Sequence, residues 1–324
     1  MDSDPVLLVT GGSRGIGAAV VRMAVARGYD VCFSYVSQQA AADRLVDELR
    51  GARPGVRLLA VQADVAEPGD VARLFERSLQ ELGRLDALVN NAGITGRIGP
   101  FRDTTLETLR RVLDVNVLGT MLCAQHAVRH WQDQGRGGAI VNLSSVAATL
   151  GSPHEYVHYA GAKGAVDSFS IGLAKELAAQ GIRVNVVSPG PALTEIHAAA
   201  GEPDRLARVS GRIPMGRPAT AEEVAQAVLW LLSDAALYVT GTVIKVAGGL
   251  YPRVGGETPR ARGLATSRGA GCAPGVADHD PARGARYDHP PGTPRRAALR
   301  APPGRRRTAA AAAPASRRAC ACGC

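Results

Sequence analysis

Tyr159 and Lys163 are the two side chains in this sequence best suited to transfer a proton. They stand four residues apart in a segment, 158–179, whose apolar spacing predicts a helix, so both project from one helical face. A phenol with a pKa of about 10 is a weak acid at neutral pH, and a neighbouring ammonium stabilises its anion. The pair could therefore exchange a proton with an oxygen atom of a bound molecule. Taken alone, a Tyr and a Lys at this spacing are more often an ordinary surface pair.

Two adjacent serines could hold that oxygen atom. Ser144 and Ser145 directly follow an expected strand at 139–143, at the end where open α/β sheets bind their ligands. The alternative is that these hydroxyls serve only a turn or a helix cap. The sequence leaves the choice between the two serines open, and we prefer Ser145.

A glycine-rich turn at 10–17 follows the first expected strand and leads into a helix. Glycines let the backbone turn tightly and approach a pyrophosphate, while the free N–H groups of a helix N-terminus attract phosphate. The spacing G-x3-G-x-G differs from the common G-x-G-x-x-G fingerprint, and such a turn could be only a tight connection. Its position after the first strand favours a dinucleotide site.

The choice of dinucleotide depends on two positions. NAD-preferring sites carry an Asp or Glu about 20 residues after the glycine turn, and the second expected strand, 30–35, ends without one. Arg14 lies inside the turn, where its guanidinium could pair with a ribose 2′-phosphate; the alternative is a solvated loop charge. Together these features favour NADP(H), with NAD(H) as the alternative.

The elements that must position these residues alternate regularly. Short β-branched runs predict seven strands, at 6–10, 30–35, 56–62, 87–90, 139–143, 182–187 and 242–246. Helical periodicity covers 16–27, 38–50, 69–82, 105–134, 158–179 and 221–233. Apolar strands alternating with helices predict a parallel sheet covered on both faces. We therefore expect an α/β fold with a Rossmann-type, doubly wound, seven-stranded sheet and a nucleotide crevice at its switch point.

The motifs, taken in order, resemble those of the short-chain dehydrogenase/reductase superfamily. Its TGxxxGxG, NNAG, YxxxK and PGxxxT motifs correspond to residues 10–17, 90–93, 159–163 and 189–194. The resemblance covers residues 5–250. Within the superfamily, the chain is most similar to the glucose-dehydrogenase-like and 3-oxoacyl-carrier-protein-reductase-like branches.

The resemblance implies a role for each matching residue. Tyr159 would be the general acid/base, and Lys163 would lower its pKa and hold the nicotinamide ribose. Ser145 would orient the substrate oxygen, and Asn116 would hold a water molecule that relays protons. Asp64 and Val65 would contact the adenine. The residues implied to bind the cofactor are Thr10, Gly11, Ser13, Arg14, Gly15, Ile16, Gly17, Asp64, Val65, Asn91, Ala92, Gly93, Tyr159, Lys163, Pro189, Gly190 and Thr194.

Two polar segments border the expected substrate site. His154, Glu155, Tyr156 and His158 precede Tyr159; a metal site is conceivable there, but we favour lining of the substrate pocket and expect no metal. The stretch 191–215 shows little regular apolar periodicity, which predicts a mobile lid over the substrate.

Composition changes abruptly after residue 250. The segment 251–324 holds 14 of the 38 basic residues, 4 of the 29 acidic ones and 10 of the 20 prolines. It has too few apolar residues to offset its chain entropy, so we expect a disordered tail after a catalytic domain at 1–250. The tail could be an arginine-rich arm that binds nucleic acid, but we favour read-through sequence without function.

The remaining features indicate location and assembly. Residues 1–5 are acidic and lead directly into a strand, so we expect no signal peptide. No apolar run approaches the roughly 20 residues that cross a bilayer, and Cys32 and Cys123 lie in apolar runs, which indicates reduced thiols. We expect a cytoplasmic protein, and the family resemblance implies a homotetramer.

Together these observations predict an oxidoreductase that transfers a hydride between NADP(H) and a small carbonyl or alcohol substrate. One alternative is an NAD(P)-binding regulator or redox sensor without turnover. Another is a 3-oxoacyl-carrier-protein reductase, which would carry basic residues near its active-site mouth; Arg136 could fill one such position, but Gln180 stands where a second would be.

Overall fold

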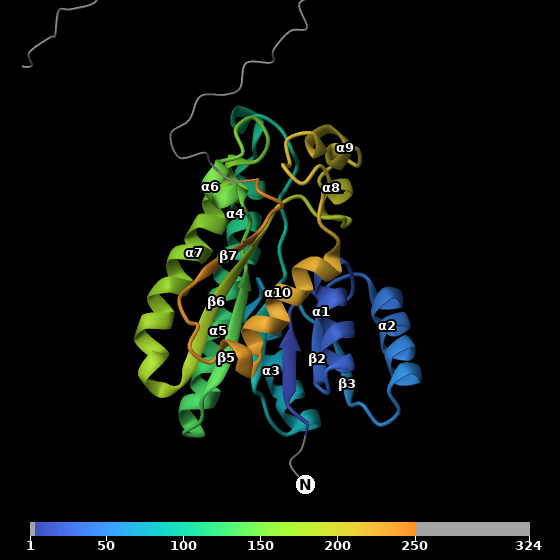
Figure 1. Ribbon diagram of the computed structural model, residues 1–324, viewed down its shortest axis with the longest axis vertical. Coiled ribbons are helices and arrows are strands. Elements are labelled where there is room, and N and C mark those ends of the chain that lie inside the picture. Colours follow the sequence, from blue (N-terminus) through green and yellow to red (C-terminus); the bar gives the residue numbers. More distant parts are fainter. Residues whose placement is uncertain (1–3, 251–324) are drawn as a thin grey trace, which may run out of the picture. The chain divides into compact units, whose positions relative to one another are not determined.

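The seven expected strands all form and lie in one parallel sheet, in the order β3-β2-β1-β4-β5-β6-β7 (Figure 1). The structure, a computed structural model, describes residues 4–250, and the predicted tail at 251–324 lies outside them. The strands are β1 (Val6–Val9), β2 (Asp30–Tyr35), β3 (Leu58–Gln62), β4 (Ala87–Asn90), β5 (Gly138–Leu143), β6 (Ile182–Pro189) and β7 (Val243–Val246). The prediction of a doubly wound Rossmann-type sheet is confirmed.

Each expected helix also forms within a few residues of its predicted ends. The long helices are α1 (Gly15–Ala26), α2 (Gln39–Ala52), α3 (Pro68–Leu82), α4 (Leu106–Leu113), α5 (Gly119–Asp133), α7 (Val157–Leu177) and α10 (Ala221–Leu232). Local sequence explains several ends: Pro68 begins α3, the left-handed Gly83 ends it, and Thr220 and Glu223 form a capping box on α10. The expected single helix at 105–134 is continuous but contains a π-helical segment, Asp114–Leu118, between α4 and α5.

Strand residues alternate between two buried layers because successive side chains point to opposite faces of a sheet. On one face, Leu7 and Val9 of β1 pack in a cluster with α1, α2 and α10. On the other, Val6 and Leu8 pack with α3, α5 and α7. Helices therefore cover both faces, and polar groups can gather only at the two edges formed by the strand ends.

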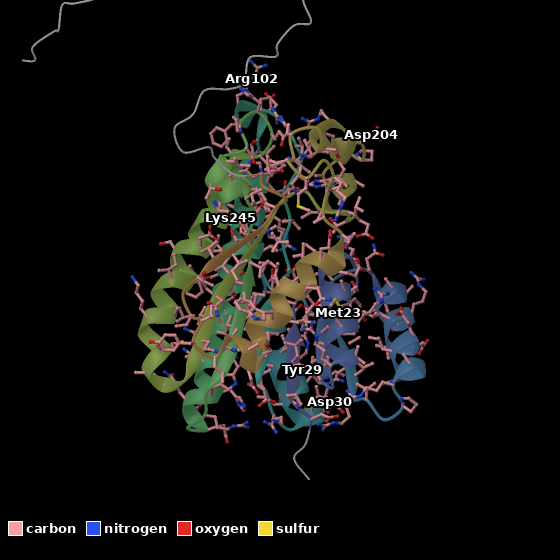
Figure 2. The ribbon with its side chains drawn as sticks, in the orientation of Figure 1. Met23, Tyr29, Asp30, Arg102, Asp204 and Lys245 are labelled. Carbon is pink, nitrogen blue, oxygen red and sulfur yellow. The ribbon has the colours of Figure 1, made fainter. Side chains whose placement is uncertain are left out.

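The strand order reverses between β1 and β4. From β1 the chain runs outward through β2 and β3, then returns to β4 on the other side of β1. The connections leaving β1 and β4 diverge at their carboxyl ends, which opens a crevice there. Beyond that edge lie two short helices, α8 (Ile196–Ala199) and α9 (Arg205–Ser210) (Figure 1). Figure 2 shows Asp204, which precedes α9, and Asp30 at opposite ends of the sheet.

Helices α8 and α9 lie within the stretch 191–215, which we expected to form a mobile lid. The stretch contains these helices of four and six residues, and its mobility stays a prediction. Helices of one or two turns are too short to show an apolar period in sequence, which explains why they were missed. A third short helix, α6 (Ala147–Leu150), follows β5.

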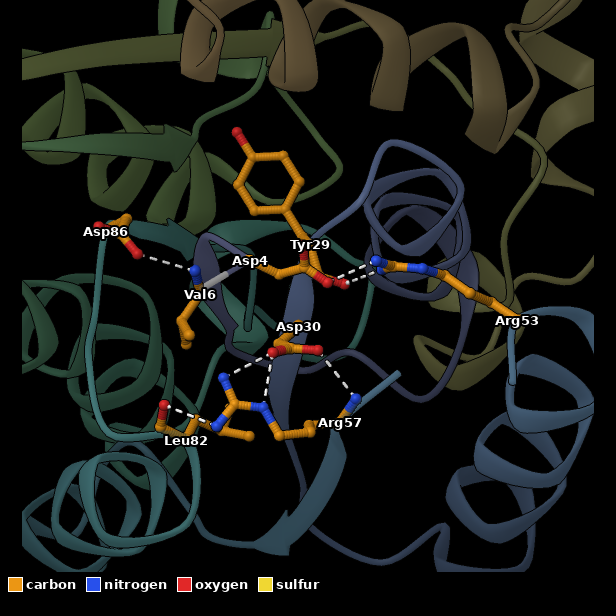
Figure 3. A network of polar contacts seen from close by, with 8 residues as sticks. All are labelled: Asp4, Val6, Tyr29, Asp30, Arg53, Arg57, Leu82 and Asp86. Atoms are coloured by element: carbon orange, nitrogen blue, oxygen red, sulfur yellow. Dashed lines mark hydrogen bonds and ion pairs between the residues drawn. The ribbon is translucent and has the colours of Figure 1, made fainter. Parts of the chain in front are cut away.

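A network of carboxylate contacts joins neighbouring strands at the amino-terminal end of the sheet, where the strands begin (Figure 3). Asp30 is 3% exposed, and it accepts hydrogen bonds from the backbone N–H of Arg57 at 2.8 Å and from its Nε at 2.7 Å. Asp86 accepts from the backbone N–H of Val6 at 2.8 Å. These contacts join β2 to the start of β3, and β1 to the start of β4, at the end of the sheet opposite the crevice, which gives that end a structural role.

Replacing Asp30 by Asn is expected to lower the free energy of unfolding by about 1–2 kcal/mol, because an amide at this buried position accepts fewer hydrogen bonds from the backbone and side chain of Arg57 than a carboxylate does. Urea unfolding followed by circular dichroism measures this change. The matched control is Arg22→Gln, which breaks the exposed Arg22–Glu48 pair and should change stability by less than about 1 kcal/mol. Equal effects of the two variants would contradict the assignment of Asp30 to the buried network.

The two cysteines within residues 4–250 lie in apolar surroundings, as their sequence context predicted. Cys32 and Cys123 are buried, unbridged thiols, and burial raises the pKa of each to about 12. Within residues 4–250, every helix is too short or too polar to traverse a lipid bilayer.

Candidate active site

A cleft of about 700 Å³ opens at the carboxyl edge of the sheet and brings together most of the predicted site residues. Its wall is built from the glycine turn, the segments after β2, β3, β4, β5 and β6, one face of α7, and the segment that contains α8 and α9. The predicted residues that line it are Gly11, Ser13, Arg14, Gly15, Ile16, Asp64, Val65, Asn91, Ala92, Gly93, Ser145, Tyr159, Lys163, Pro189, Gly190 and Thr194. Thr10, Gly17 and Asn116 do not line it and lie behind its wall.

Thr10 and Asn91 fasten the glycine turn to the end of β4. The Thr10 hydroxyl oxygen accepts hydrogen bonds from the backbone N–H groups of Asn91 and Ala92, both at 3.0 Å. The Asn91 side-chain amide donates to the carbonyl oxygens of Thr10 at 3.0 Å and Gly11 at 2.9 Å. Thr10 therefore shapes the turn, since its hydroxyl oxygen holds two backbone N–H groups of the segment after β4, and it is not among the residues that line the cleft.

Gly17 shows why the turn needs glycine. A Cβ atom at this position would stand 2.2 Å from the Gly11 carbonyl oxygen and 2.6 Å from the Asn91 amide nitrogen. The first turn of α1 therefore packs directly on the backbone that precedes it, and the free N–H groups of α1 open toward the cleft. This cradle, closed to any side chain at Gly17, fits the pyrophosphate of a dinucleotide.

The end of β2 is bound closely to the same turn. Ser34 is buried, and its hydroxyl oxygen accepts a hydrogen bond from the Gly11 N–H at 3.1 Å. Tyr35, Val36 and Ser37 continue along the cleft wall, so no carboxylate lies where an NAD ribose would find one. Arg14, the residue before α1, lines the cleft. This side of the cleft can hold a phosphate-bearing ribose.

Asp64 also lines the cleft but already has a partner. One carboxylate oxygen accepts a hydrogen bond from Arg111 of α4, and Arg111 lines the cleft as well. The pair fixes the wall beside the segment after β3. Arg111 was not predicted, because its only signal is its placement by the fold.

Tyr159 and Lys163 lie on the cleft-facing side of α7. The ammonium nitrogen of Lys163 is 5.7 Å from the centroid of the Tyr159 ring. Lys163 is 3% exposed and donates a hydrogen bond to the Leu143 carbonyl oxygen at 2.7 Å, which ties α7 to the end of β5. Gly93 lies next to Lys163, since a Cβ atom at Gly93 would stand 3.3 Å from the Lys163 Nζ atom. The surface-pair alternative is therefore wrong, because both side chains are buried.

The structure separates the two serines. The Ser144 hydroxyl is buried and donates to the Lys163 carbonyl oxygen at 3.3 Å. The Ser145 hydroxyl forms a side-chain hydrogen bond with Tyr159, which lowers the pKa of that phenol. Ser145 is thus the serine placed beside the phenol, while Ser144 secures α7 to β5.

Burial controls the protonation of this pair. It raises the pKa of Tyr159 well above its ordinary range; Tyr156 raises it further, and Ser145 and Arg205 oppose the rise. The groups that lower the pKa of Tyr159 here are Ser145 and Arg205, so the expected lowering by Lys163 stays a prediction. Burial likewise lowers the pKa of Lys163 to about 8.

Asn116 lies within the π-helical segment and is fully buried. Its side-chain amide donates to the carbonyl oxygens of Ile94 at 2.7 Å and Val112 at 2.8 Å, and its side-chain oxygen accepts from the Ile94 N–H at 3.2 Å. These bonds leave the side chain fully satisfied and hold the segment after β4 in place. Asn116 therefore positions the part of the cleft wall that contains Gly93.

The loop before Tyr159 supplies part of the substrate side of the cleft. Glu155 and Tyr156 line it, as expected, whereas His154 and His158 do not. Arg205 and Val209 of α9 also line it and were missed from sequence, and Arg205 contacts Glu155 directly. Within the described part of the chain, no cluster of three or more His, Cys, Asp or Glu is arranged to hold a metal ion.

Arg136 does not lie at the mouth of the cleft. Its guanidinium pairs at 3.0 Å with Asp86, just before β4 at the amino-terminal edge of the sheet. Gln180, where a second basic residue was sought, bonds to Gln132. Our placement of Arg136 was therefore wrong for a single chain, since the residue lies at the opposite end of the strands from Tyr159.

Comparison with known proteins gives the same class as the fold and the cleft. A family model described as enoyl-(acyl carrier protein) reductase matches residues 11–251. The chain is 48% identical over 246 residues to an uncharacterized oxidoreductase, YgfF, of Escherichia coli strain K12, covering 75% of this chain and 99% of that protein. It is 41% identical to a cis-4-hydroxycyclohexanecarboxylate dehydrogenase of Sinomonas cyclohexanicum, covering 76% and 96%.

A solved structure extends the comparison to a bound cofactor. A blue fluorescent protein from a metagenomic library, in complex with NADPH, is 36% identical with a TM-score of 0.69, covering 76% of this chain and 97% of that one. The chain belongs to the short-chain dehydrogenase/reductase family and is an NAD(P)-binding oxidoreductase.

Proposed function

We propose that this protein transfers a hydride between NADP(H) and a small carbonyl or alcohol substrate, with Tyr159 as the general acid/base. The observation that carries the proposal is that one cleft joins the glycine turn to Ser145, Tyr159 and Lys163. When bound, the nicotinamide supplies or accepts the hydride. The chain's own residues must then hold the substrate oxygen and move its proton.

The protonation of Tyr159 fits the role of proton donor. Burial raises the pKa of Tyr159, so at neutral pH the phenol keeps its proton and can donate it to a carbonyl oxygen. The Ser145 hydroxyl lies beside the Tyr159 hydroxyl and can hold the same substrate carbonyl oxygen. Lys163, whose pKa burial lowers to about 8, carries a proton at neutral pH and can resupply the site or hold a ribose hydroxyl.

The preference for NADP(H) rests on Arg14 and on the end of β2. Arg14 lines the cleft beside Ser37 and Gln38, and no carboxylate of β2 is there to bind a free ribose 2′-hydroxyl. A guanidinium in this position can form two parallel hydrogen bonds to a 2′-phosphate. NAD(H) remains the alternative that binding must distinguish.

Titration of the full chain with NADPH and NADH, followed by calorimetry, tests the cofactor preference. NADPH is expected to bind more tightly, and Arg14→Gln should weaken NADPH by about tenfold or more while leaving NADH unchanged. Arg27→Gln is the matched control, because Arg27 follows the same helix at its other end and bonds to Gln226. Tighter binding of NADH, or equal effects of the two variants, would contradict the preference.

We also propose that the protein is a cytoplasmic homotetramer. Exposed leucines on α4 and the adjoining π-helical segment, Leu106, Leu113 and Leu118, support association with further copies of the chain. The buried free thiols Cys32 and Cys123 support a reducing compartment. Sedimentation of the full chain measures the assembly.

One relative supports the proposed substrate class. The cis-4-hydroxycyclohexanecarboxylate dehydrogenase relative supports a small hydroxylated substrate.

A further inference from the structure

Arg205 places a guanidinium beside the proposed reaction centre. It is the first residue of α9, is 7% exposed and lines the cleft. Its Cζ atom is 5.0 Å from the centroid of the Tyr156 ring, and that ring meets the Tyr159 ring edge-on with centroids 5.3 Å apart. One aromatic ring therefore separates the guanidinium from Tyr159. A substrate that reaches Tyr159 must pass close to this charge.

Two nitrogen atoms of the same region lack partners. The Arg205 Nη2 donates to Glu155, but its Nε is buried and has no hydrogen-bond partner. The Nδ1 atom of His197, on α8, is also buried and unpartnered. His197 is 7% exposed and lines the cleft. An unsatisfied buried polar group costs about 1–3 kcal/mol, so oxygen atoms of a ligand that reached both nitrogens would bind favourably.

The surrounding charges favour an anion. Glu155 accepts from Arg205 and Arg208, and Glu202 pairs with Arg208. Arg212 also lines the cleft and forms no ion pair among the described residues. Burial, and next the charge of Arg205, lower the pKa of His197 to about 4, so the imidazole is neutral and can present an N–H.

Two further carboxylates line the cleft, Asp64 and Glu195. Asp64 is paired with Arg111, and Glu195 lies on the other side of the cleft. A Cβ at Gly15, in the glycine turn, would stand 3.6 Å from the Glu195 Oε2 atom. Glu195 therefore borders the proposed cofactor end of the cleft. Around Arg205 the arginines outnumber the glutamates by three to two. The titratable residues counted are Glu155, His197, Glu202, Arg205, Arg208 and Arg212.

We propose that Arg205 and His197 form a subsite for a carboxylate on the substrate, at a position remote from the reacting carbonyl. The inference rests on the proposed function and specifies its substrate class: an oxo acid or its hydroxy acid. The carboxylate accepts from the Arg205 Nε–H and the His197 imidazole N–H, and the carbonyl oxygen then faces Tyr159 and Ser145. Such a contact also orients the substrate, because it fixes the end distant from the reacting carbon.

Matched pairs of substrates test the subsite. The full chain is assayed by NADPH oxidation with 4-oxopentanoate, 5-oxohexanoate and 6-oxoheptanoate, each beside its methyl ester. The ester keeps the ketone and removes the charge. For at least one chain length we expect kcat/KM for the acid to exceed that for the ester by tenfold or more. Equal rates for acid and ester at every length would overturn the proposal.

Variants then assign the preference to Arg205. Arg205→Gln should bring the acid-to-ester ratio close to 1. The double variant Glu155→Gln/Arg205→Met should do the same while removing both charges of the buried Arg205–Glu155 pair, which protects the test against a folding defect. Arg208→Gln is the matched control: it removes an arginine from the same Glu155 carboxylate, but Arg208 does not line the cleft, so the ratio should stay at the wild-type value. An unchanged ratio in Arg205→Gln would overturn the proposal.

Failure of the subsite and failure of the proposed function give different results. If none of the six compounds reacts but other carbonyl compounds are reduced with NADPH, the subsite is wrong and the oxidoreductase function stands. If NADPH binds and no carbonyl or alcohol compound reacts in either direction, the proposed function itself fails.

Discussion

Replacing Tyr159 by Phe is expected to lower turnover by about 10³-fold and to leave the affinity for NADPH within about twofold of wild type. The variant keeps the buried ring that packs against Tyr156 and removes only the hydroxyl beside Ser145. General acid–base catalysis contributes about 10²–10⁴ to a rate. Single-turnover assays with a carbonyl substrate, together with calorimetric titration of NADPH, measure the two quantities separately.

The same variant distinguishes an enzyme from a cofactor-binding regulator. A regulator would bind NADPH and show no activity that depends on the Tyr159 hydroxyl. Tyr29→Phe is the control, because Tyr29 lies at the amino-terminal edge of the sheet, far from the cleft (Figure 2). If Tyr159→Phe retains more than about a tenth of the wild-type turnover, another group must donate the proton.

Replacing Lys163 by Met is expected to reduce turnover by at least about 100-fold while making the protein more stable. The lowering of the Lys163 pKa from its ordinary value of 10.5 to about 8 means that folding disfavours the charged amine by about 3 kcal/mol. Methionine has a similar length and no charge. It loses the hydrogen bond to the Leu143 carbonyl oxygen, so we expect a net gain of about 1–2 kcal/mol at pH 7, measured by urea unfolding.

The pH dependence of stability gives this prediction a second readout. Between about pH 8 and 10.5 the unfolded chain binds the Lys163 proton that the folded protein has released. The wild type therefore becomes more stable as pH rises through this window, relative to a chain without the group. The stability advantage of Lys163→Met should shrink over the same range.

Lys175→Met is the matched control for this variant. Lys175 lies on the same helix, α7, and is exposed, so its removal should change neither turnover nor the pH dependence of stability. A loss of stability in Lys163→Met at pH 7 would show that the hydrogen bond to Leu143 outweighs the burial of the charge.

The stability cost of Lys163 and the unsatisfied nitrogens of Arg205 and His197 occur at the same edge of the sheet. The opposite edge, by contrast, pairs Asp30 with Arg57 and Asp86 with the backbone of β1 (Figure 3). One end of the strands is thus built for stability, and the other keeps polar groups available for ligands. This division follows from the parallel sheet, because helices cover both faces and leave only the edges open.

Much of the cleft could be predicted from short-range patterns. The glycine turn at 10–17 and the Tyr159–Lys163 pair depend on spacings within one turn or one helix, which the sequence displays directly. The preference for Ser145 over Ser144 rested on the family resemblance, because the order of residues alone does not show which of the two hydroxyls meets the Tyr159 side chain. The placement of Arg136, in contrast, could have been excluded from the sequence, because a residue two positions before β5 must lie at the amino-terminal end of that strand.

The sequence by itself determined the alternation of apolar strands and helices, and hence the doubly wound sheet with its site at the carboxyl edge. It also determined the glycine turn and the helical face that carries Tyr159. Only the tertiary structure decided that Thr10 and Asn116 lie behind the cleft wall, and that Arg205 and His197 enter the cleft. The physical reason is that their environments are made by contacts between distant segments, which no local periodicity records.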